Sequence, residues 1–371
     1  MTELEQLRWH RVMKIQFTRK PFVFCCLALL SMMPLSRGGI EDGKLDIYWV
    51  DVEGGAATLI VTPTNESILI DTGNPGERDS SRIHRVATAA GLERIDHLIV
   101  THFHTDHFGG AADLAKRMPI DRIHDNGIPD RDPDGRPDNE VFAGKIQPYR
   151  EIAVSARSIL NPGDQVPLKP VVGGVPLSLR CLVARQEMID GPPGSRENPD
   201  CESVSPKAKD LSDNANSIVV LLQFGEFDLF VGGDLTWNVE SRLVCPVNRV
   251  GEVDVYQVDH HGLDQSNHPA LVRALAPTLA VMSNGTSKGC QPATFATLQS
   301  VPSIQAVYQI HKNLRDDTEH NTSVERIANL EAACRANFIK LSVEPSGASY
   351  RIQIPATGQS EVFVSRSISR R

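Results

Sequence analysis

The chain has 371 residues, of which 40% are hydrophobic, and carries a formal net charge of −8. This length allows one large domain or two modest ones with a substantial core. The acidic charge argues against sequence-independent nucleic-acid binding, which depends on Lys and Arg neutralising phosphates. Phosphoester chemistry stays open, because metal ions can supply positive charge locally.

Residues 1–38 combine a basic region, the short apolar run 21–30 and small residues before Gly38. This order is typical of a secretory signal, and the run is short for a membrane span. We therefore predict an exported protein, periplasmic or extracellular, with an uncleaved membrane anchor as the alternative. Without this segment, which holds six Lys/Arg and two Asp/Glu, the formal charge becomes −12.

The first half of the remaining chain has a hairpin pattern in residues 57–71, where two apolar runs flank a polar turn and the second run ends on Asp71. Residues 80–91 have helical apolar spacing. The strand predicted over 95–100 leads directly into a histidine-rich turn.

The same order recurs later in the chain. A second hairpin, residues 217–234, ends on Asp234, a weaker helix is predicted over 237–244, and a strand over 253–258 leads into His260 and His261. We interpret this as a duplication. The fold class is then α/β, with two pseudo-repeated halves whose sheets stack between outer helices and whose strand ends meet at one edge.

The section 125–212 interrupts this repeat. It is rich in Pro, Gly and acidic residues, with a helix predicted over 141–159 and short strands over 165–184. We expect it to border a substrate cleft, because such loops often carry binding residues. The main domain is predicted to span 45–355, and residues 356–371 to form a basic tail.

Cysteine is sparse outside the N-terminal segment. Five cysteines remain, and no C-x-x-C spacing occurs, so the sequence gives no indication of a structural zinc site. An exported chain can pair some of them, but the odd number leaves at least one thiol free.

The strongest chemical signal is the cluster between residues 102 and 107, which directly follows the apolar run 98–100. It contains His102, His104, Asp106 and His107. Imidazole and carboxylate ligands together suit Zn²⁺, Fe or Mn²⁺ and leave a position for water. The cluster therefore predicts a metalloenzyme that uses a metal-activated water.

This H-x-H-x-D-H pattern resembles the signature of the metallo-β-lactamase superfamily. The segments 69–73, 232–235 and 259–262 support the resemblance in the expected order, over residues 46 to about 355. Residues 51–56, and His260-His261-Gly262 followed by Ser266, look most like the soluble domain of ComEC/Rec2-type DNA-uptake proteins and their secreted relatives. The resemblance implies an αββα sandwich with one or two divalent ions, Zn²⁺ before Mn²⁺ or Fe.

The resemblance also implies roles for individual residues. His102 and His104 would bind a first ion, and Asp106 and His107 a second. Asp234 would bridge the two ions. One histidine of the 260–261 pair would complete the second site, with His261 favoured over His260 because ligand histidines in this family often precede Gly.

Two further carboxylates have supporting roles in this interpretation. Asp106 would also act in catalysis, orienting the water or carrying a proton. Asp71 would fix a ligand imidazole from behind without touching metal.

The sequence departs from the family pattern before the second hairpin, where a further histidine is usual. By spacing, Asp213 falls on that ligand position, with Asn214 and Asn216 as alternatives or a weak first site as another. A His-Pro of the ComEC-like branch is also missing, and Gln291 stands there as a possible substrate contact.

Several other polar residues have plain structural interpretations that we prefer. The segment 130–135 starts like a calcium loop but has Val141 at its twelfth position, so a solvated acidic loop is expected. His268 is expected to cap a helix. Surface positions are preferred over functional ones for His124, His311 and Lys288, although Lys288 would suit an anionic substrate.

The function predicted from these patterns is a metal-dependent hydrolase acting on a phosphoester-type or other small-molecule substrate. An amide, lactone or β-lactam hydrolase of the same fold is the enzymatic alternative, and a non-catalytic metal-binding scaffold the other. The charge gives no strong signal for nucleic-acid binding. We expect membrane contact only through an uncleaved N-terminus. The patterns do not specify the substrate or the oligomeric state.

Overall fold

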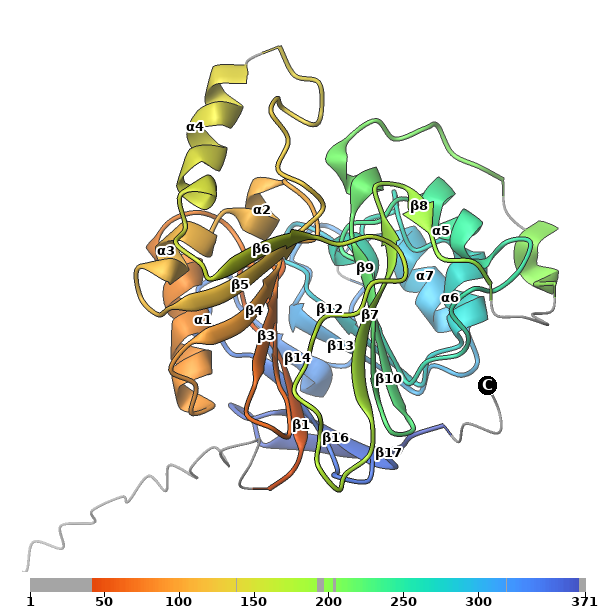
Figure 1. Ribbon diagram of the computed structural model, residues 1–371. Coiled ribbons are helices and arrows are strands. Elements are labelled where there is room, and N and C mark those ends of the chain that lie inside the picture. Colours follow the sequence, from red (N-terminus) through yellow and green to blue (C-terminus); the bar gives the residue numbers. More distant parts are fainter. Residues whose placement is uncertain (1–41, 138, 192–196, 203–204, 318, 367–371) are drawn as a thin grey trace, which may run out of the picture. The chain divides into compact units, whose positions relative to one another are not determined.

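The computed structural model describes residues 42–137, 139–191, 197–202, 205–317 and 319–366. The predicted signal or anchor segment lies outside these residues. Two β-sheets, each covered by helices on its outer side, make up the described part of the chain (Figure 1). None of its helices has the length and apolar character needed to cross a bilayer.

The first sheet has nine strands in the order β17-β16-β15-β1-β2-β3-β4-β5-β6. Its strands are β1 (Leu45–Trp49), β2 (Thr58–Val61), β3 (Ser67–Ile70), β4 (Ile95–Ile99), β5 (Ile120–Asp125), β6 (Ala156–Ile159), β15 (Ile339–Val343), β16 (Ser349–Ile354) and β17 (Gln359–Val364). Strands β3 to β6 run parallel to one another, and the other pairs are antiparallel.

The second sheet has eight strands in the order β14-β13-β12-β11-β10-β9-β7-β8. Its strands are β7 (Leu177–Ala184), β8 (Glu187–Met188), β9 (Val219–Phe224), β10 (Phe227–Val231), β11 (Val255–Gln257), β12 (Leu279–Met282), β13 (Ala306–His311) and β14 (Ile327–Asn329). Strands β10 to β14 are parallel, so their carboxyl ends share one edge.

Helices α1 and α3 cover the first sheet, with α4 packed beside them and projecting beyond it, and α5, α6 and α7 cover the second (Figure 1). The α-helices are α1 (Glu77–Ala89), α2 (Thr105–Phe108), α3 (Ala111–Ala115), α4 (Asn139–Arg150), α5 (Trp237–Val244), α6 (Pro269–Leu275) and α7 (Pro292–Ser300). Short 3₁₀ helices are η1 (Pro199–Glu202), η2 (Asp213–Asn216), η3 (Asp259–Gly262) and η4 (Val324–Arg326).

The main core lies between the sheets, and strand alternation decides which side chains enter it. In β3, Ile68 and Ile70 point into this core, while Leu69 points to the helices. Successive side chains of a strand face opposite sides, so a strand buried on both faces reads as a continuous apolar run. The αββα sandwich predicted from the sequence is therefore confirmed.

The repeated order of elements is also present. The hairpin β2–β3 is followed by α1 and by β4, which pairs parallel to β3. The hairpin β9–β10 is followed by α5 and by β11, which pairs parallel to β10. Asp71 directly follows β3 and Asp234 lies three residues after β10, so each hairpin leads into an aspartate, as the patterns predicted.

Two predicted boundaries are wrong. The helix expected over 141–159 ends at Arg150, because residues 156–159 form β6 beside β5, where the Arg157 guanidinium pairs with Asp125 at 3.1 Å. The tail expected from residue 356 begins too early, because β17 extends the sheet and stacks the Phe363 ring on Tyr350. Pairing with distant strands decides both segments, and local spacing does not show it.

Candidate metal centre

The loops that follow β3, β4, β10 and β11 meet where the carboxyl ends of the strands lie. Within the described residues, four side chains from these loops and from α2 offer ligand atoms that all lie within 4.8 Å of one another: Asp106, His107, Asp234 and His261. The structure therefore brings together residues from both halves of the chain.

Asp234 Oδ2 is the common point of the group. It lies 3.2 Å from His107 Nε2, 3.4 Å from His261 Nε2 and 3.4 Å from His260 Nε2. His102 Nε2 is farther away, at 3.9 Å. One oxygen facing several imidazole nitrogens is the arrangement expected of a residue that bridges cations.

Asp71 lies behind this group, in contact with His107 and with the backbone. His107 Nδ1–H donates to Asp71 Oδ2 at 2.8 Å, which leaves the Nε2 lone pair of His107 facing Asp234. The Thr101 backbone N–H and hydroxyl both donate to the same carboxylate at 2.8 Å. Asp71 thus fixes the tautomer of His107 and the start of the loop, without entering the group itself.

The other imidazoles are oriented in the same way. The Thr101 hydroxyl donates to Asp71, so it accepts from His102 Nδ1–H at 3.1 Å, and the buried His102 Nε2 has no hydrogen-bond partner. His261 Nδ1–H donates to the Ser283 carbonyl at 3.1 Å. The Nε2 atoms of His102, His107 and His261 are therefore all turned toward the Asp234 carboxylate.

The electrostatics show that this group needs positive charge. Burial alone would lower the pKa of His107, but Asp234, Asp106 and Asp71 outweigh it and hold the pKa well above its usual value. Burial would raise the pKa of Asp234, but the surrounding histidines hold it well below its usual value.

This charge balance gives a direct test of fit for a metal. Lone pairs and carboxylates that face one another at about 3 Å repel unless protons or a cation lie between them. A donor set of two imidazoles and two carboxylates suits Zn²⁺, Mn²⁺ or Fe. The residues present therefore fit a divalent ion.

His260 and His261 lie in an unusual turn, η3, and have different partners. Both have left-handed backbone, with φ of 53° and 55°, and Gly262 follows with φ of 84°. The His260 ring contacts Ser266 and Asn214 as well as Asp234. Burial lowers the pKa of His260 to about 4, so it is neutral at physiological pH.

His104 and Asp213 lie outside the four-residue group. His104 Nε2 lies 2.9 Å from Asp134 Oδ1, and Asp134 also accepts from the Asp213 backbone N–H. The Asp213 carboxylate accepts from the Phe103 N–H at 2.6 Å and from the Asn216 amide at 3.0 Å. Asp213 therefore stabilises the turn that carries His104.

Asp134 is the residue that the sequence interpretation missed. It lies in the segment expected to be a solvated acidic loop, yet its side chain is 9% exposed and contacts His104 and Arg136. Asp134 lies 30 residues from His104 in the sequence, so no local pattern indicates that the two side chains meet.

Of the lesser candidates, Lys288 alone reaches the group: its ammonium contacts Asp106 Oδ2. A cavity of about 410 Å³, lined in part by His104, Asp106, Arg136 and Lys145, opens beside it. Burial would raise the pKa of Asp106, but His107, His261 and Lys288 hold it well below its usual value.

The remaining candidates have structural partners. His124 lies between His97 and Ser158, away from the cavity lining. His268 caps α6 by accepting from the Ala270 N–H, as expected. Gln291 accepts from the Asp264 N–H.

Comparison with known proteins decides the family. The profile described as "Metallo-beta-lactamase superfamily" matches residues 50–177. The chain is 24% identical over 279 residues to ComE operon protein 3 of Bacillus subtilis, covering 70% of this chain and 30% of that protein. The chain belongs to the metallo-beta-lactamase superfamily.

Two further relatives refine this placement. Competence protein ComA of Neisseria gonorrhoeae is 23% identical over 249 residues, covering 67% of this chain and 28% of that protein. A metal-dependent hydrolase of Cupriavidus metallidurans is 34% identical over 92 residues, covering 24% of this chain and 29% of that protein. The chain thus falls in the ComEC/Rec2 branch of the superfamily and spans about a third or less of these relatives' length. Membership places it among metal-dependent hydrolases in general.

Proposed function

We propose that this chain hydrolyses a phosphoester-type substrate with the help of a divalent metal ion. The observation that carries the proposal is the group Asp106, His107, Asp234 and His261 with the Lys288 ammonium beside it. The group supplies ligands for the ion, and Lys288 supplies a positive charge at the edge where a substrate anion would lie.

The ion, when bound, would lower the pKa of a water molecule and polarise the scissile oxygen. Asp234, His107 and His261 are the buried ligands. Asp106 is partly exposed, so it is the ligand that can orient a water or move a proton at its Oδ2. Asp71 keeps the His107 Nε2 lone pair directed at the ion.

Positive side chains favour a phosphoester over a neutral amide or lactone. Lys288 contacts Asp106, and Arg136 and Lys145 line the cavity that opens there. Asp132 and Asp134 also line it, so the wall is mixed, and Arg136 pairs with Asp134 at 2.7 Å. Phosphoryl oxygens are best bound by such cations together with a metal ion.

We further propose Zn²⁺ as the resident ion, with His261 as its histidine from the 260–261 pair. A second ion would use His102 and His104, with Asp234 as the bridge. Among the described residues, the buried His102 Nε2 has no hydrogen-bond partner, and this supports the second position. Export of the chain also stays a proposal, supported by the disulfide Cys201–Cys245, since disulfides persist in oxidising compartments.

The test compares Lys288→Met with wild type on bis-p-nitrophenyl phosphate, p-nitrophenyl phosphate, nitrocefin and a lactone. We expect kcat/KM for a phosphoester to fall by roughly 10- to 100-fold, because a charge contact to the substrate is lost. Metal content, measured on the same samples, should not change. Lys209→Met, on an exposed segment, is the matched control.

Two results would contradict the proposal. Wild-type protein that holds metal but cleaves nitrocefin or the lactone and neither phosphoester favours the alternative substrate class. Full phosphoester activity in Lys288→Met would show that the Lys288 charge does not help to bind the substrate.

A further inference from the structure

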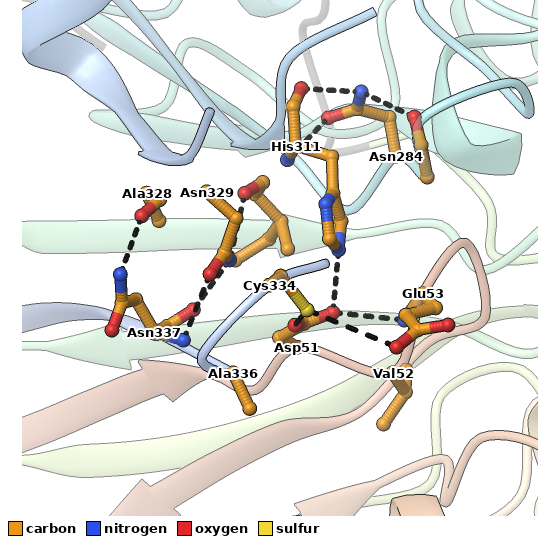
Figure 2. Close-up of polar contacts among 12 residues, drawn as sticks. Asp51, Val52, Glu53, Asn284, His311, Ala328, Asn329, Cys334, Ala336 and Asn337 are labelled. Carbon is orange, nitrogen blue, oxygen red and sulfur yellow. Dashed lines mark hydrogen bonds and ion pairs between the residues drawn. The ribbon is translucent and has the colours of Figure 1, made fainter. Parts of the chain in front are cut away.

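A second group of possible ligands lies apart from the centre described above. Among the described residues, Asp51, His311 and Cys334 offer ligand atoms that all lie within 4.8 Å of one another. Asp51 follows β1 of the first sheet, His311 ends β13 of the second, and Cys334 lies between β14 and β15. Figure 2 shows the His311 ring and the Cys334 sulfur turned toward the Asp51 carboxylate.

The contacts within this group are close. His311 Nε2 lies 2.7 Å from Asp51 Oδ1, and the Cys334 thiol donates to Asp51 Oδ2 at 3.1 Å. Ligands 2.0–2.1 Å from a tetrahedral Zn²⁺ are separated by roughly 3.3 Å. The three side chains therefore need to separate slightly, and need no change of direction, to surround an ion.

A fourth oxygen lies nearby, outside this group and paired with Arg82. Glu53 Oε1 lies 3.8 Å from Cys334 Sγ, and the Glu53 N–H donates to Asp51 at 2.9 Å. Asp51 is fully buried and His311 nearly so, while Cys334 is half-buried. The group thus has two buried ligands and an open side through which an ion can enter.

The charges also suit a cation. Arg82 contacts both Asp51, at 3.1 Å, and Glu53, at 2.7 Å. Arg78 contacts Glu53 at 2.9 Å and Asp79 at 2.6 Å, so three carboxylates and two guanidinium groups leave a net negative charge here. Replacement of the thiol proton by Zn²⁺ makes the sum of these charges zero, and Zn²⁺ prefers a thiolate ligand.

We propose that Asp51, His311 and Cys334, with Glu53 as the fourth ligand, form a second site for a divalent transition metal, Zn²⁺ in the first instance. The site is independent of the catalytic proposal. It contains a thiol, whereas the central group contains only imidazole and carboxylate ligands.

This second site would clamp the two sheets together next to the central group. The loop that begins at Asp51 reaches Ala56, whose N–H donates to the Asp106 carbonyl at 3.1 Å. The His311 backbone is paired with Asn284, as Figure 2 shows, and the adjacent Ser283 carbonyl accepts from His261. An ion here would therefore lie next to the segments that contact Asp106 and His261, without contributing a ligand to the central group.

The test uses Co²⁺ and the full chain, because a Co²⁺–thiolate bond gives a charge-transfer band that imidazole and carboxylate ligands do not give. We expect Co²⁺ to produce this band in wild type and in Asp234→Ala, and Zn²⁺ to abolish it by displacement. Cys334→Ser should lose the band and one equivalent of tight Zn²⁺ binding.

Cys290→Ser is the matched control, since Cys290 is a free cysteine elsewhere in the fold. Circular dichroism of each variant shows that it is folded. His311→Gln provides a second variant that keeps the thiol, and it should weaken Zn²⁺ binding by at least 10-fold.

Two outcomes would overturn the proposal. Absence of the band in folded wild type would mean that Arg82 and hydrogen bonds alone hold these residues. Persistence of the band in Cys334→Ser, with its loss in Cys290→Ser, would place the thiolate elsewhere.

Discussion

Asp71 directs the central imidazoles although it does not join the group that faces the cavity. Its two oxygens accept from His107 and from the backbone and hydroxyl of Thr101. Thr101 in turn orients His102. A single carboxylate therefore sets the tautomers of two neighbouring histidines, and both keep an Nε2 lone pair for an ion.

Asp71→Asn tests this role directly. The amide keeps the size of the side chain but cannot accept at both oxygens, so His107 loses part of its orientation. We expect metal affinity to fall by about 10- to 100-fold, measured by competition with a chelator. Asp96→Asn, a buried carboxylate that binds Ser67, is the control and should leave affinity unchanged. Equal losses in both variants would mean that general destabilisation is responsible.

At the scale of elements, the turn in η3 is held from outside by the loop between β12 and α7. The Cys290 N–H donates to the His261 carbonyl, and Gly289 has a φ of 79°. A Cβ at Gly289 would lie 1.9 Å from the His261 carbonyl oxygen. The loop that carries Lys288 can thus pack against His261 only with glycine at this position.

Gly289→Ala is therefore expected to lower both stability and metal affinity. Strain at the left-handed backbone costs about 1–2 kcal/mol in the free energy of unfolding, and the clash with His261 adds to it. Gly358→Ala has a similar φ, 75°, with nothing near its Cβ, so it isolates the backbone strain. Urea unfolding and metal titration of both variants provide the measurement. Indistinguishable metal affinities would show that the His261 contact has no role.

The neighbouring strands β4 and β5, inside the first sheet, contain a polar network of a different kind. His124 lies between His97 and Ser158, at 3.0 Å and 2.7 Å, and His97 reaches Glu66. Burial lowers the pKa of His124 to about 4, so the folded state keeps this ring neutral well below the pKa of 6.5 in the unfolded chain. Between these two values the unfolded chain binds a proton that the folded chain does not.

Stability should therefore fall as pH decreases from 6.5 to 4, by up to about 3 kcal/mol from this residue. His124→Gln removes the titrating group, and we expect a smaller pH dependence in urea unfolding with chelator present. Parallel curves for wild type and His124→Gln would contradict the assignment.

For the molecule as a whole, the central site depends on both halves. Alternating apolar residues and the repeated Asp and His endpoints predict the sandwich, because a strand end fixes its loop at the edge. His107, Asp234 and His261 could be expected together on this basis. The partners of His104 could not, since Asp134 reaches it through a long loop without periodicity. Asp51, His311 and Cys334 likewise come from three segments whose proximity follows only from the sheet order.

The most direct test of the central claim is metal content and phosphodiester hydrolysis of Asp234→Ala, compared with wild type, both in a Cys334→Ser background that removes the proposed second site. We predict at least one bound divalent ion per chain and hydrolysis of bis-p-nitrophenyl phosphate in the parent protein, and loss of both in Asp234→Ala. Retention of the ion and the activity in Asp234→Ala would contradict the account.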